Sequence, residues 1–235
     1  MRILIVNPNT TSSMTDKVAL AARAAVSNDT QIIATTSKHG PVSIEGYYDE
    51  ALSLAGLLQE IRTCNDYDAV VIACFDDTGL DAARCLTDRP VIGIGEAGYR
   101  TAAMLSNHFS VVTTLSRSVP ALEHNILRYG LERQCASVRA CDVPVLELEH
   151  NTGDALEKIE AEIVKAIELD RAEAIVLGCA GMTDLADMLS RKYELPVLDG
   201  VACAAAMCEA MARLRLRTSR KGGYAPPPDH KREIE

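Results

Sequence analysis

The sequence contains no tryptophan, and aromatic residues make up only 4% of its 235 residues. Because 48% of the residues are hydrophobic, the core must be built mainly from Ala, Val, Ile and Leu side chains. A basic surplus is also missing, since the formal net charge is −9. Nucleic acids and anionic membranes are bound through basic faces, so this charge argues against both kinds of partner.

Long apolar segments are absent as well. No stretch approaches the roughly 20 residues of a membrane-spanning helix. The N-terminal segment, MRILIVNPNTTSS, has one Arg and a short apolar run, without the longer apolar region and small-residue cleavage site of a signal peptide. We therefore expect no membrane association, and a cytoplasmic protein whose first β-strand is formed by RILIV.

The eight cysteines include no CxxC pair, and the five histidines do not cluster with them. Zinc binding is therefore not expected. A disulfide scaffold is not expected either, because the chain is long, helix-rich and assigned to a reducing compartment. Neither a P-loop nor a GxGxxG motif is present, so we expect no metal and no cofactor. Most of the cysteines are predicted to be small buried apolar residues.

Short β-branched runs alternate with amphipathic segments along the whole chain. Expected strands are Ile3–Asn7, Gln31–Thr35, Ala69–Cys74, Val91–Ile94, Phe109–Thr113, Ser137–Cys141, Ala174–Cys179 and Val197–Leu198. Expected helices are Ser12–Ser27, Tyr47–Thr63, Thr78–Leu86, Glu96–Asn107, Val119–Tyr129, Thr152–Leu169, Met182–Arg191 and Gly200–Leu216. Uniformly apolar strands separated by helices predict parallel sheets covered on both faces, which is an α/β fold.

The chain also repeats itself at one long offset. DAVVIACFDD, from Asp68, corresponds to EAIVLGCAGM, from Glu173, and Cys179 follows Cys74 by 105 positions. Two pseudo-symmetric α/β lobes are therefore expected, with a cleft between them. The first lobe is predicted to comprise residues 1–97 and about 199–215, and the second residues 98–198. The tail, 216–235, is predicted to be disordered or to wrap a neighbouring subunit.

Cys74 and Cys179 are predicted at the last positions of equivalent strands, each before a helix. Ligands of parallel sheets bind beyond the carboxyl ends of the strands, so both thiols belong at a ligand-binding edge. A following helix N-terminus would lower the pKa of each thiol. The alternative is that both are buried core thiols, which is the better interpretation of an isolated strand cysteine but is weakened here by their equivalent positions. The other six cysteines have no such pairing and keep the core interpretation.

Two thiols on opposite sides of a cleft suit few reactions. A disulfide switch is one, but it requires Cα atoms within about 7 Å and an oxidising partner. The other is proton transfer at a carbon atom, in which a thiolate removes a proton from one face and a thiol returns one to the opposite face. This is two-base racemisation or epimerisation, and it requires neither metal nor cofactor.

At these residues the chain resembles the aspartate/glutamate racemase superfamily, and within it the hydantoin racemases and the closely related allantoin racemases. The resemblance covers about residues 1–215. It is carried by five stretches in the right order: NPNTT at Asn7–Thr11, GPVSIEGYYDE at Gly40–Glu50, CFDDTGLDAAR at Cys74–Arg84, PVIGIGEA at Pro90–Ala97 and GCAGM at Gly178–Met182. The resemblance implies two pseudo-symmetric lobes, one catalytic cysteine from each, and racemisation of C5 of 5-monosubstituted hydantoins.

The sequence departs from the amino-acid racemases of this superfamily after each cysteine. Those enzymes usually have Asn-Thr after the first Cys and Thr-His after the second, which hold the substrate carboxylate. Here Phe75 follows Cys74, and Ala180-Gly181 follows Cys179. A neutral ring recognised by backbone groups fits these positions better than a charged amino acid. The C5 proton of a hydantoin lies beside a neutral carbonyl and gives an enolate, so a thiolate can remove it with modest help from hydrogen-bond donors.

The remaining site candidates lie in loops near the two cysteines. The expected substrate contacts are Asn9, Ser43, Ile44, Phe75, Thr114, Ala180 and Gly181. Thr113 is a further polar candidate, at the second-lobe position that corresponds to Asn7. Asp76 and Asp77 are interpreted as carboxylates at a helix start, because a negative charge near Cys74 raises its pKa and does not suit a base.

Two other functions stay open on the residues alone. The chain could racemise allantoin, which is itself a 5-ureido-hydantoin, by the same mechanism. It could also be a non-catalytic two-lobed protein that binds a metabolite in the same cleft. In each case the partner is a small molecule, and we also expect a homo-oligomer.

Overall fold

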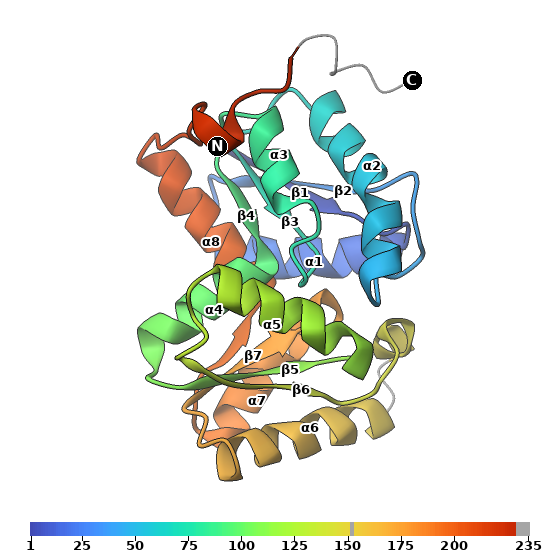
Figure 1. Cartoon of the computed structure of the whole chain (residues 1–235), viewed down its shortest axis with the longest axis vertical. Helices are drawn as coiled ribbons and strands as arrows, with labels where there is room; N and C mark the ends of the chain where they lie inside the picture. Colours follow the sequence, from blue (N-terminus) through green and yellow to red (C-terminus); the bar gives the residue numbers. More distant parts are fainter. Residues whose placement is uncertain (151–152, 229–235) are drawn as a thin grey trace.

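The computed structural model describes residues 1–150 and 153–228, and it has two parallel β-sheets stacked one above the other (Figure 1). The strands are β1 (Arg2–Asn7), β2 (Gln31–Thr36), β3 (Ala69–Ile72), β4 (Val91–Gly93), β5 (Phe109–Thr113), β6 (Cys135–Ala140), β7 (Ala174–Gly178) and β8 (Val197–Asp199). All eight were expected from the sequence, with small differences at their ends.

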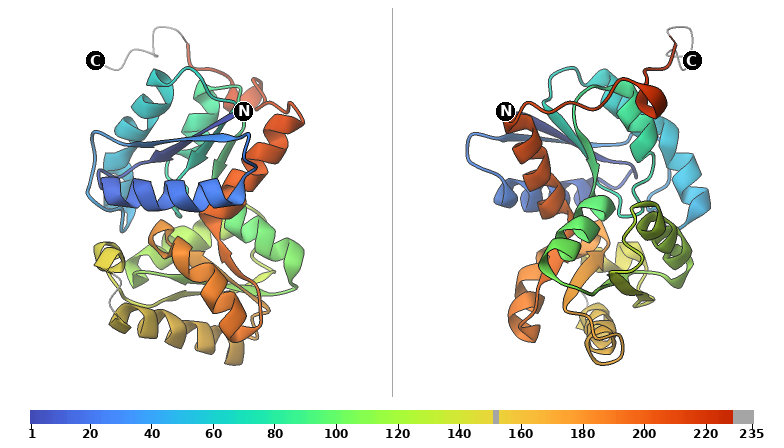
Figure 2. Two further views of the ribbon diagram at one scale, coloured as in Figure 1. Left: turned by 180° about the vertical axis from the view of Figure 1, so that it is seen from behind. Right: turned by 60° about the vertical axis from the view of Figure 1, so that its left-hand side comes forward.

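Helices cover both faces of each sheet (Figures 1 and 2). The α-helices are α1 (Ser12–Ala25), α2 (Tyr47–Thr63), α3 (Leu80–Leu86), α4 (Ile94–Leu105), α5 (Val119–Arg128), α6 (Gly153–Glu168), α7 (Ala186–Tyr193) and α8 (Gly200–Arg213). The 3₁₀ helices are η1 (Ser116–Ser118), η2 (Val145–His150), η3 (Ala180–Leu185) and η4 (Gly222–Tyr224). The predicted helix start at Thr152 lies outside the described residues.

The two sheets have the same topology. The first has the strand order β2-β1-β3-β4 and the second β6-β5-β7-β8, and every pairing is parallel. In β3 and β7, the strands that lead to the two cysteines, each residue is buried. Strands that are apolar on both faces require a helix layer on each side. The expected fold class, two pseudo-symmetric α/β lobes, is confirmed.

The few aromatic side chains are concentrated where the lobes meet. The ring of Tyr99, on α4, packs edge-on against Phe75, with centroids 5.2 Å apart, and stacks with Phe109, with centroids 6.2 Å apart. These are the only two phenylalanines of the chain. One from each lobe therefore packs on the same buried tyrosine, and one continuous hydrophobic cluster spans both sheets.

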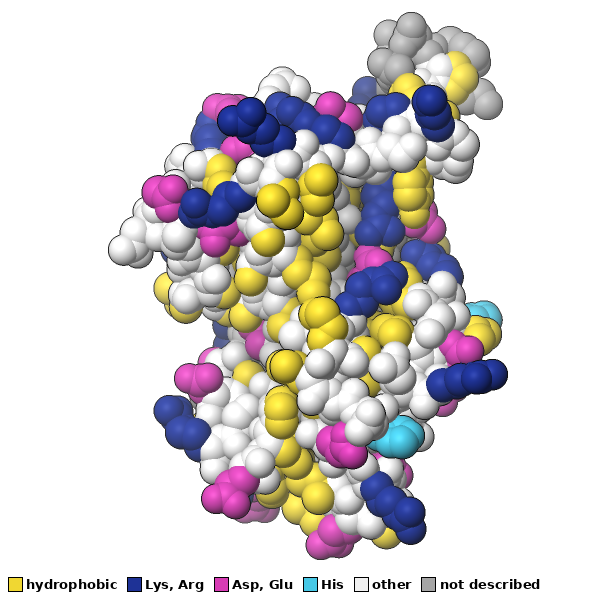
Figure 3. Space-filling view, turned by 90° about the vertical axis from the view of Figure 1, so that its left-hand side faces the viewer, with side chains coloured by type: hydrophobic (Ala, Val, Ile, Leu, Met, Phe, Trp, Pro, Cys, Tyr) yellow, Lys and Arg dark blue, Asp and Glu magenta, His cyan; other side chains and the backbone are white. Residues whose placement is uncertain are grey.

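Two helices connect the lobes. α8 follows the last strand of the second sheet and returns to pack on α1, β3 and α4. The predicted lobe boundary at residue 97 falls inside α4, which contacts both β4 and β7. The face formed by α4 and α8 has a strip of hydrophobic side chains along both lobes (Figure 3). Exposed apolar residues of these two helices and the segment that follows include Met104, Leu105, Met211, Leu214 and Leu216.

The described part of the tail packs on its own first lobe. Thr218 donates from its backbone N–H to the Asp88 carbonyl at 2.8 Å, and Tyr224 donates to Asp81 at 3.0 Å. The guanidinium of Arg220 donates to the carbonyls of Arg84, Cys85 and Thr87, at the C-terminal end of α3. Arg is a suitable partner for the carbonyls that a helix end leaves without N–H donors. The described tail therefore lies against its own lobe as far as residue 228, and 229–235 lie outside the described residues; a tail that is disordered or wraps a neighbouring subunit stays a prediction.

Among the described residues, no helix is long and apolar enough to cross a membrane.

Candidate active site

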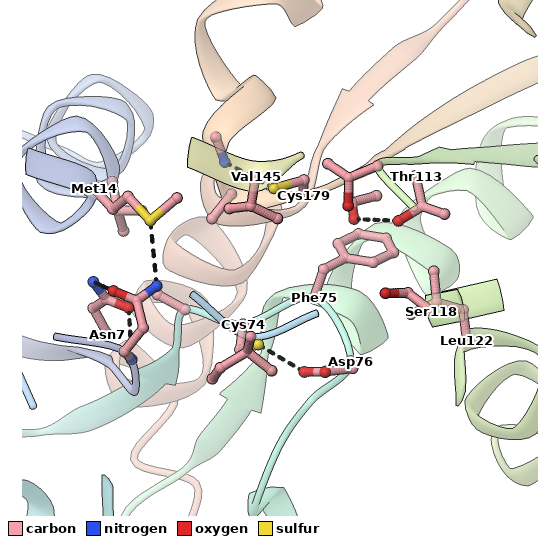
Figure 4. Close-up of a pocket in the computed structure, with 18 residues that line it drawn as sticks. Asn7, Met14, Cys74, Phe75, Asp76, Thr113, Ser118, Leu122, Val145 and Cys179 are labelled. Atoms are coloured by element: carbon pink, nitrogen blue, oxygen red, sulfur yellow. Dashed lines mark hydrogen bonds between the residues drawn. The ribbon is translucent and has the colours of Figure 1, made fainter. Parts of the chain in front are cut away.

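A cavity lies between the two sheets, at the carboxyl ends of their strands, and is lined by residues of both lobes (Figure 4). Cys74 lines it from the first lobe and Cys179 from the second. The structure also places Asn9, Ile44, Phe75, Thr114, Ala180 and Gly181 in its wall. Ser43 does not line this cavity, although its neighbour Ile44 does. The side chain that faces the site is therefore the apolar one of the pair.

Cys74 lies in the turn that follows the first sheet's β3. The strand ends at Ile72, so the predicted strand end at Cys74 is two residues too late. The thiol donates a hydrogen bond to Oδ1 of Asp76 at 2.6 Å, and the Thr78 hydroxyl donates to the same oxygen at 2.7 Å. The Cys74 sulfur is therefore held as a hydrogen-bond donor to a carboxylate.

Cys179 occupies the equivalent place after β7, which ends at Gly178. Its sulfur accepts a hydrogen bond from the Gly181 N–H at 3.4 Å, inside the first turn of η3. Gly181 stands at the same distance along the chain from Cys179 as Asp76 from Cys74. One thiol thus meets a carboxylate and the other a backbone donor, which is an asymmetry that the repeat does not reveal.

The predicted lowering of both thiol pKa values is wrong. Burial raises the pKa of Cys179 to about 11, although the Gly181 N–H opposes this shift. Burial also raises the pKa of Cys74 well above its ordinary value, and the negative charge of Asp76 adds to the effect. The cause lies in the chain path, because α3 begins only at Leu80, so no α-helix N-terminus points at Cys74. Both cysteines are therefore neutral thiols at neutral pH in the free protein.

Lys17 connects α1 of the first lobe with the turn that carries Cys179. Its ammonium donates to the Gly181 carbonyl at 2.7 Å and lies 3.1 Å from Asp184. The positive charge favours the thiolate of Cys179 and lowers its pKa against the larger effect of burial. The sequence offered no signal for this contact, which joins residues of different lobes.

Two asparagines form a buried network beside the cavity. Asn7 donates from Nδ2 to Oδ1 of Asn9 at 2.9 Å, and the same oxygen accepts the Thr11 N–H at 2.9 Å. Nδ2 of Asn9 donates to the Met14 thioether at 3.3 Å. Because a thioether is a weak acceptor, this amide is the part of the network that a ligand carbonyl can engage.

The second lobe closes the cavity with two threonines after β5. Thr113 and Thr114 are buried, and the Thr113 hydroxyl donates to the Gly178 carbonyl at 3.0 Å. A Cβ atom at Gly178 would lie 2.8 Å from Cβ of Thr113, so only glycine allows this approach of β7 to β5. Gly178 therefore allows β7 to lie close to Thr113 at the wall of the cavity.

Asp77 has a structural function that sequence reasoning did not find. Its carboxylate accepts the N–H groups of Gly95 and Glu96, at 3.0 and 2.8 Å, and so caps α4, not the nearby α3. Tyr129 also donates to it, at 2.6 Å. Burial nevertheless raises the pKa of Asp77 to about 7. A Cβ atom at Gly93 would lie 1.9 Å from Oδ1 of Asp77, which explains the first glycine of the GIG sequence.

Sequence reasoning also missed part of the apolar wall. The missed apolar residues are Met14, Val18, Leu122 and Val145. The polar Ser118, which also lines the cavity, was missed as well. Met14 and Val18 are four positions apart on α1 and share its buried face, a pattern that cannot be told from ordinary core packing. Among the described residues, no group of three or more His, Cys, Asp or Glu side chains could hold a metal ion.

Known proteins share both the sequence and the fold of this chain. The family model Asp/Glu/Hydantoin racemase matches residues 3–208. A hydantoin racemase of Pseudomonas sp. (strain NS671) is 43% identical over 97% of this chain and 92% of its own length, and one of Rhizobium meliloti is 46% identical over 97% and 95%. The solved allantoin racemase from Klebsiella pneumoniae is 42% identical, with a TM-score of 0.96 that covers 100% of this chain and 96% of that one.

These matches extend over the whole two-lobed unit, so they include both cysteine turns and the cavity between them. The resemblance found in the sequence is confirmed. The chain belongs to the Asp/Glu/Hydantoin racemase family and is a racemase.

Proposed function

We propose that this protein racemises 5-monosubstituted hydantoins at C5, with Cys74 and Cys179 as its two acid/base groups. The supporting observation is that the two cysteines line one cavity from equivalent turns of the two lobes. Cys74 and Cys179 lie on different sides of this cavity (Figure 4), so a substrate ring bound between them would present opposite faces of C5 to the two sulfurs. The sulfurs need to lie about 7–8 Å apart, since each must come within roughly 3–4 Å of C5.

The reaction consists of two proton transfers. The thiolate of one cysteine takes the proton from C5, and the electron pair of that C–H bond moves into the neighbouring carbonyl to give an enolate. The thiol of the other cysteine then donates its proton to the opposite face of C5, the carbonyl re-forms, and the second sulfur is left as the thiolate. Asn9 and the hydroxyl groups of Thr114 and Ser118 are suitable donors for the enolate oxygen.

The composition of the cavity supports a hydantoin with an apolar substituent. The side chains of Met14, Val18, Ile44, Leu122 and Val145 face it, together with the Phe75 ring. The polar groups that line it are uncharged apart from Asp76. A neutral ring fits this set better than a free amino-acid carboxylate, which would need a cationic partner.

Allantoin is the second candidate, and its support is the close fit to the solved Klebsiella pneumoniae structure. Its ureido group has several donors and acceptors to satisfy, and the apolar wall favours alkyl or aryl groups instead. A binding protein without catalysis would leave the configuration of any hydantoin unchanged.

The proposal also includes a homo-oligomer and a cytoplasmic location, and the cytoplasmic location agrees with eight cysteines that are all free.

The test is incubation of the purified protein in D₂O with single enantiomers of 5-benzylhydantoin, 5-isopropylhydantoin and allantoin. Optical rotation and deuterium incorporation at C5 are followed together. The proposal predicts that rotation decays to zero as one deuteron enters each molecule, and that it decays fastest for the apolar substituents. Unchanged rotation with all three compounds would contradict it, and a preference for allantoin would transfer the assignment to that substrate.

A further inference from the structure

A second cavity shares one lining residue, Asp76, with the reaction cavity. It is lined by Tyr47 and Glu50 of α2, by His124 and Arg128 of α5, and by Asp76. We call it the outer cavity. Asp76 lines both this cavity and the reaction cavity and is the residue that the two have in common. A proton that passes through Asp76 can therefore leave the Cys74 side of the site without crossing the substrate.

Glu50 is the third ionisable group of this region, after Cys74 and Asp76. Its Oε1 is buried and meets no hydrogen-bond donor among the described residues. Asp76 lines the same cavity, and its negative charge acts on the Glu50 carboxyl group. Burial, followed by the charge of Asp76, raises the pKa of Glu50 to about 8. Glu50 therefore carries a proton at neutral pH and can release it close to that pH.

The groups that face this pair belong to three segments of the chain. They are Tyr47 and Asp49 of α2, Cys74 and Thr78 of the turn after β3, and His124 and Arg128 of α5. The Thr78 hydroxyl and the Cys74 thiol both donate to Oδ1 of Asp76. Oδ1 of Asp76 is therefore committed to Cys74 and Thr78, and Asp76 lines the outer cavity together with Glu50.

A two-thiol racemase must exchange protons between its thiols and solvent, and Cys74, Asp76 and Glu50 provide a route for this exchange. One turnover moves the thiolate from one cysteine to the other, so the free enzyme exists in two proton forms. An enzyme that has converted one enantiomer must exchange its thiol protons with solvent before it can convert the same enantiomer again. At Cys74 this step is opposed by burial and by the neighbouring carboxylate. A proton carrier is needed at that sulfur.

We propose that Asp76 and Glu50 form a proton relay that connects Cys74 with the outer cavity and resets the enzyme between turnovers. Glu50 first gives its proton to water in the outer cavity. Asp76 then takes the proton of the Cys74 thiol, which leaves a thiolate, and passes it to Glu50. In the opposite direction, Glu50 protonates Asp76, Asp76 protonates the Cys74 thiolate, and water restores the proton on Glu50. This inference rests on the proposed function.

Within the described part of the second lobe, no counterpart of the relay is present. Gly181 occupies the position that corresponds to Asp76 and donates its N–H to the Cys179 sulfur. Lys17 adds a positive charge that stabilises the Cys179 thiolate. Cys179 therefore needs less assistance to lose a proton. The relay is built on the one thiol that is held as a donor to a carboxylate.

The test compares Glu50→Gln and Asp76→Asn with Glu60→Gln. Glu60 lies on the same helix, where its carboxylate accepts the Thr35 hydroxyl at 3.0 Å, away from both cavities. Because the amides cannot accept a proton, kcat of both relay variants should fall by about 10²-fold. The kcat/KM of Glu50→Gln should stay within about twofold of wild type, because proton exchange of the free enzyme limits the rate only when substrate is saturating. Added imidazole should restore kcat of Glu50→Gln by carrying the proton instead.

A second measurement is independent of racemisation. Iodoacetamide labelling of Cys74, resolved by mass spectrometry, should show a break near pH 8 in wild type and Glu60→Gln, since ionised Glu50 adds a negative charge beside the sulfur. Glu50→Gln should lose this break, while Cys179 labelling stays unchanged. Equal kcat in all three variants, equal falls of kcat and kcat/KM in Glu50→Gln, or a break retained in that variant would overturn the relay. Wild-type protein that racemises no hydantoin but shows the break would refute the function and leave the proton coupling intact.

Discussion

Sγ of Cys74 lies 2.6 Å from Oδ1 of Asp76 and donates a hydrogen bond to that carboxylate. The corresponding sulfur of the second lobe, on Cys179, accepts the Gly181 N–H instead. The two thiols therefore stand in equivalent turns with opposite hydrogen-bond roles. In the proposed reaction Cys179 is therefore the thiol that loses its proton more readily, and Cys74 is the thiol that retains it.

The first prediction concerns the ionisation of Cys179. Burial raises its pKa to about 11, so the thiolate is lost as the pH falls below that value. Its iodoacetamide labelling rate should rise about tenfold with each pH unit from neutral pH to about pH 10, whereas an unperturbed thiol levels off near about 8.5. Site-resolved mass spectrometry measures this rate. A plateau for Cys179 below pH 9 would show that the sulfur is less desolvated than its burial indicates.

The second prediction concerns the cation beside Cys179. Lys17→Met keeps the apolar stem but removes the charge that favours the thiolate and the hydrogen bond to the Gly181 carbonyl. The labelling rate of Cys179 at neutral pH should fall by about threefold to tenfold, since a shift of one pKa unit changes the thiolate fraction tenfold. Lys38→Met, at an exposed position of the first lobe, is the matched control. Equal labelling in the two variants would exclude an influence of Lys17 on the thiol.

The third prediction concerns the cap of α4. Asp77→Asn replaces one of the acceptors of the Gly95 and Glu96 N–H groups by an amide NH₂ inside a buried site. The free energy of unfolding should fall by about 1–3 kcal/mol, the cost of leaving buried hydrogen-bond partners unsatisfied. Denaturant unfolding measures it, with the exposed Asp16→Asn as the control, for which a change within about 0.5 kcal/mol is expected. Equal stabilities would show that the α4 cap contributes nothing.

Hydrophobic periodicity and the long internal repeat were sufficient to predict the two sheets and the cavity between them. The strands β3 and β7 are apolar throughout, and Cys74 and Cys179 mark the same point of each lobe after them. Six further predicted contacts also line the cavity, namely Asn9, Ile44, Phe75, Thr114, Ala180 and Gly181. Ser43 and Ile44 were both predicted as substrate contacts, and only Ile44 lines the cavity, because the direction of a side chain in a loop leaves no periodic signal.

The pKa values of the thiols could not be predicted in the same way. They depend on burial and on a 2.6 Å contact of Cys74 with a residue two positions away, whereas the sequence suggested a helix dipole. The role of Asp77 depends on a contact with Gly95, 18 residues further along the chain. The contact of Lys17 with Gly181 crosses 164 residues and both lobes. Long-range contacts of single polar side chains leave no pattern in one sequence.

The fourth prediction concerns metals. Racemisation by two thiols needs none, so exhaustive chelation followed by dialysis under a thiol reductant should leave activity within about 20% of the starting value, the error of such an assay. The reductant is essential, because oxidation of Cys74 or Cys179 also abolishes activity. Activity that is lost on chelation and returns with one particular divalent metal, but not with reductant, would replace the two-thiol mechanism by a metal-assisted one.

The central claim is that each thiol serves one face of C5, and hydrogen exchange in single-cysteine variants tests it most directly. Cys74→Ser and Cys179→Ser keep a hydroxyl beside the substrate but remove the readily formed anion, so racemisation should fall by at least about 10²-fold. Each variant retains one thiolate, which should exchange the C5 proton of one enantiomer without inverting it. Cys208→Ser, at a fully buried position away from the cavity, is the control and should lose only stability.

The measurement is deuterium incorporation from D₂O into each pure enantiomer of 5-benzylhydantoin, with chiral chromatography of the product. The account predicts that Cys74→Ser labels one enantiomer, that Cys179→Ser labels the other, and that both retain configuration. Racemisation by either variant at near wild-type rate, or labelling of the same enantiomer by both, would contradict the two-thiol mechanism and reduce the paired cysteine turns to a relic of duplication.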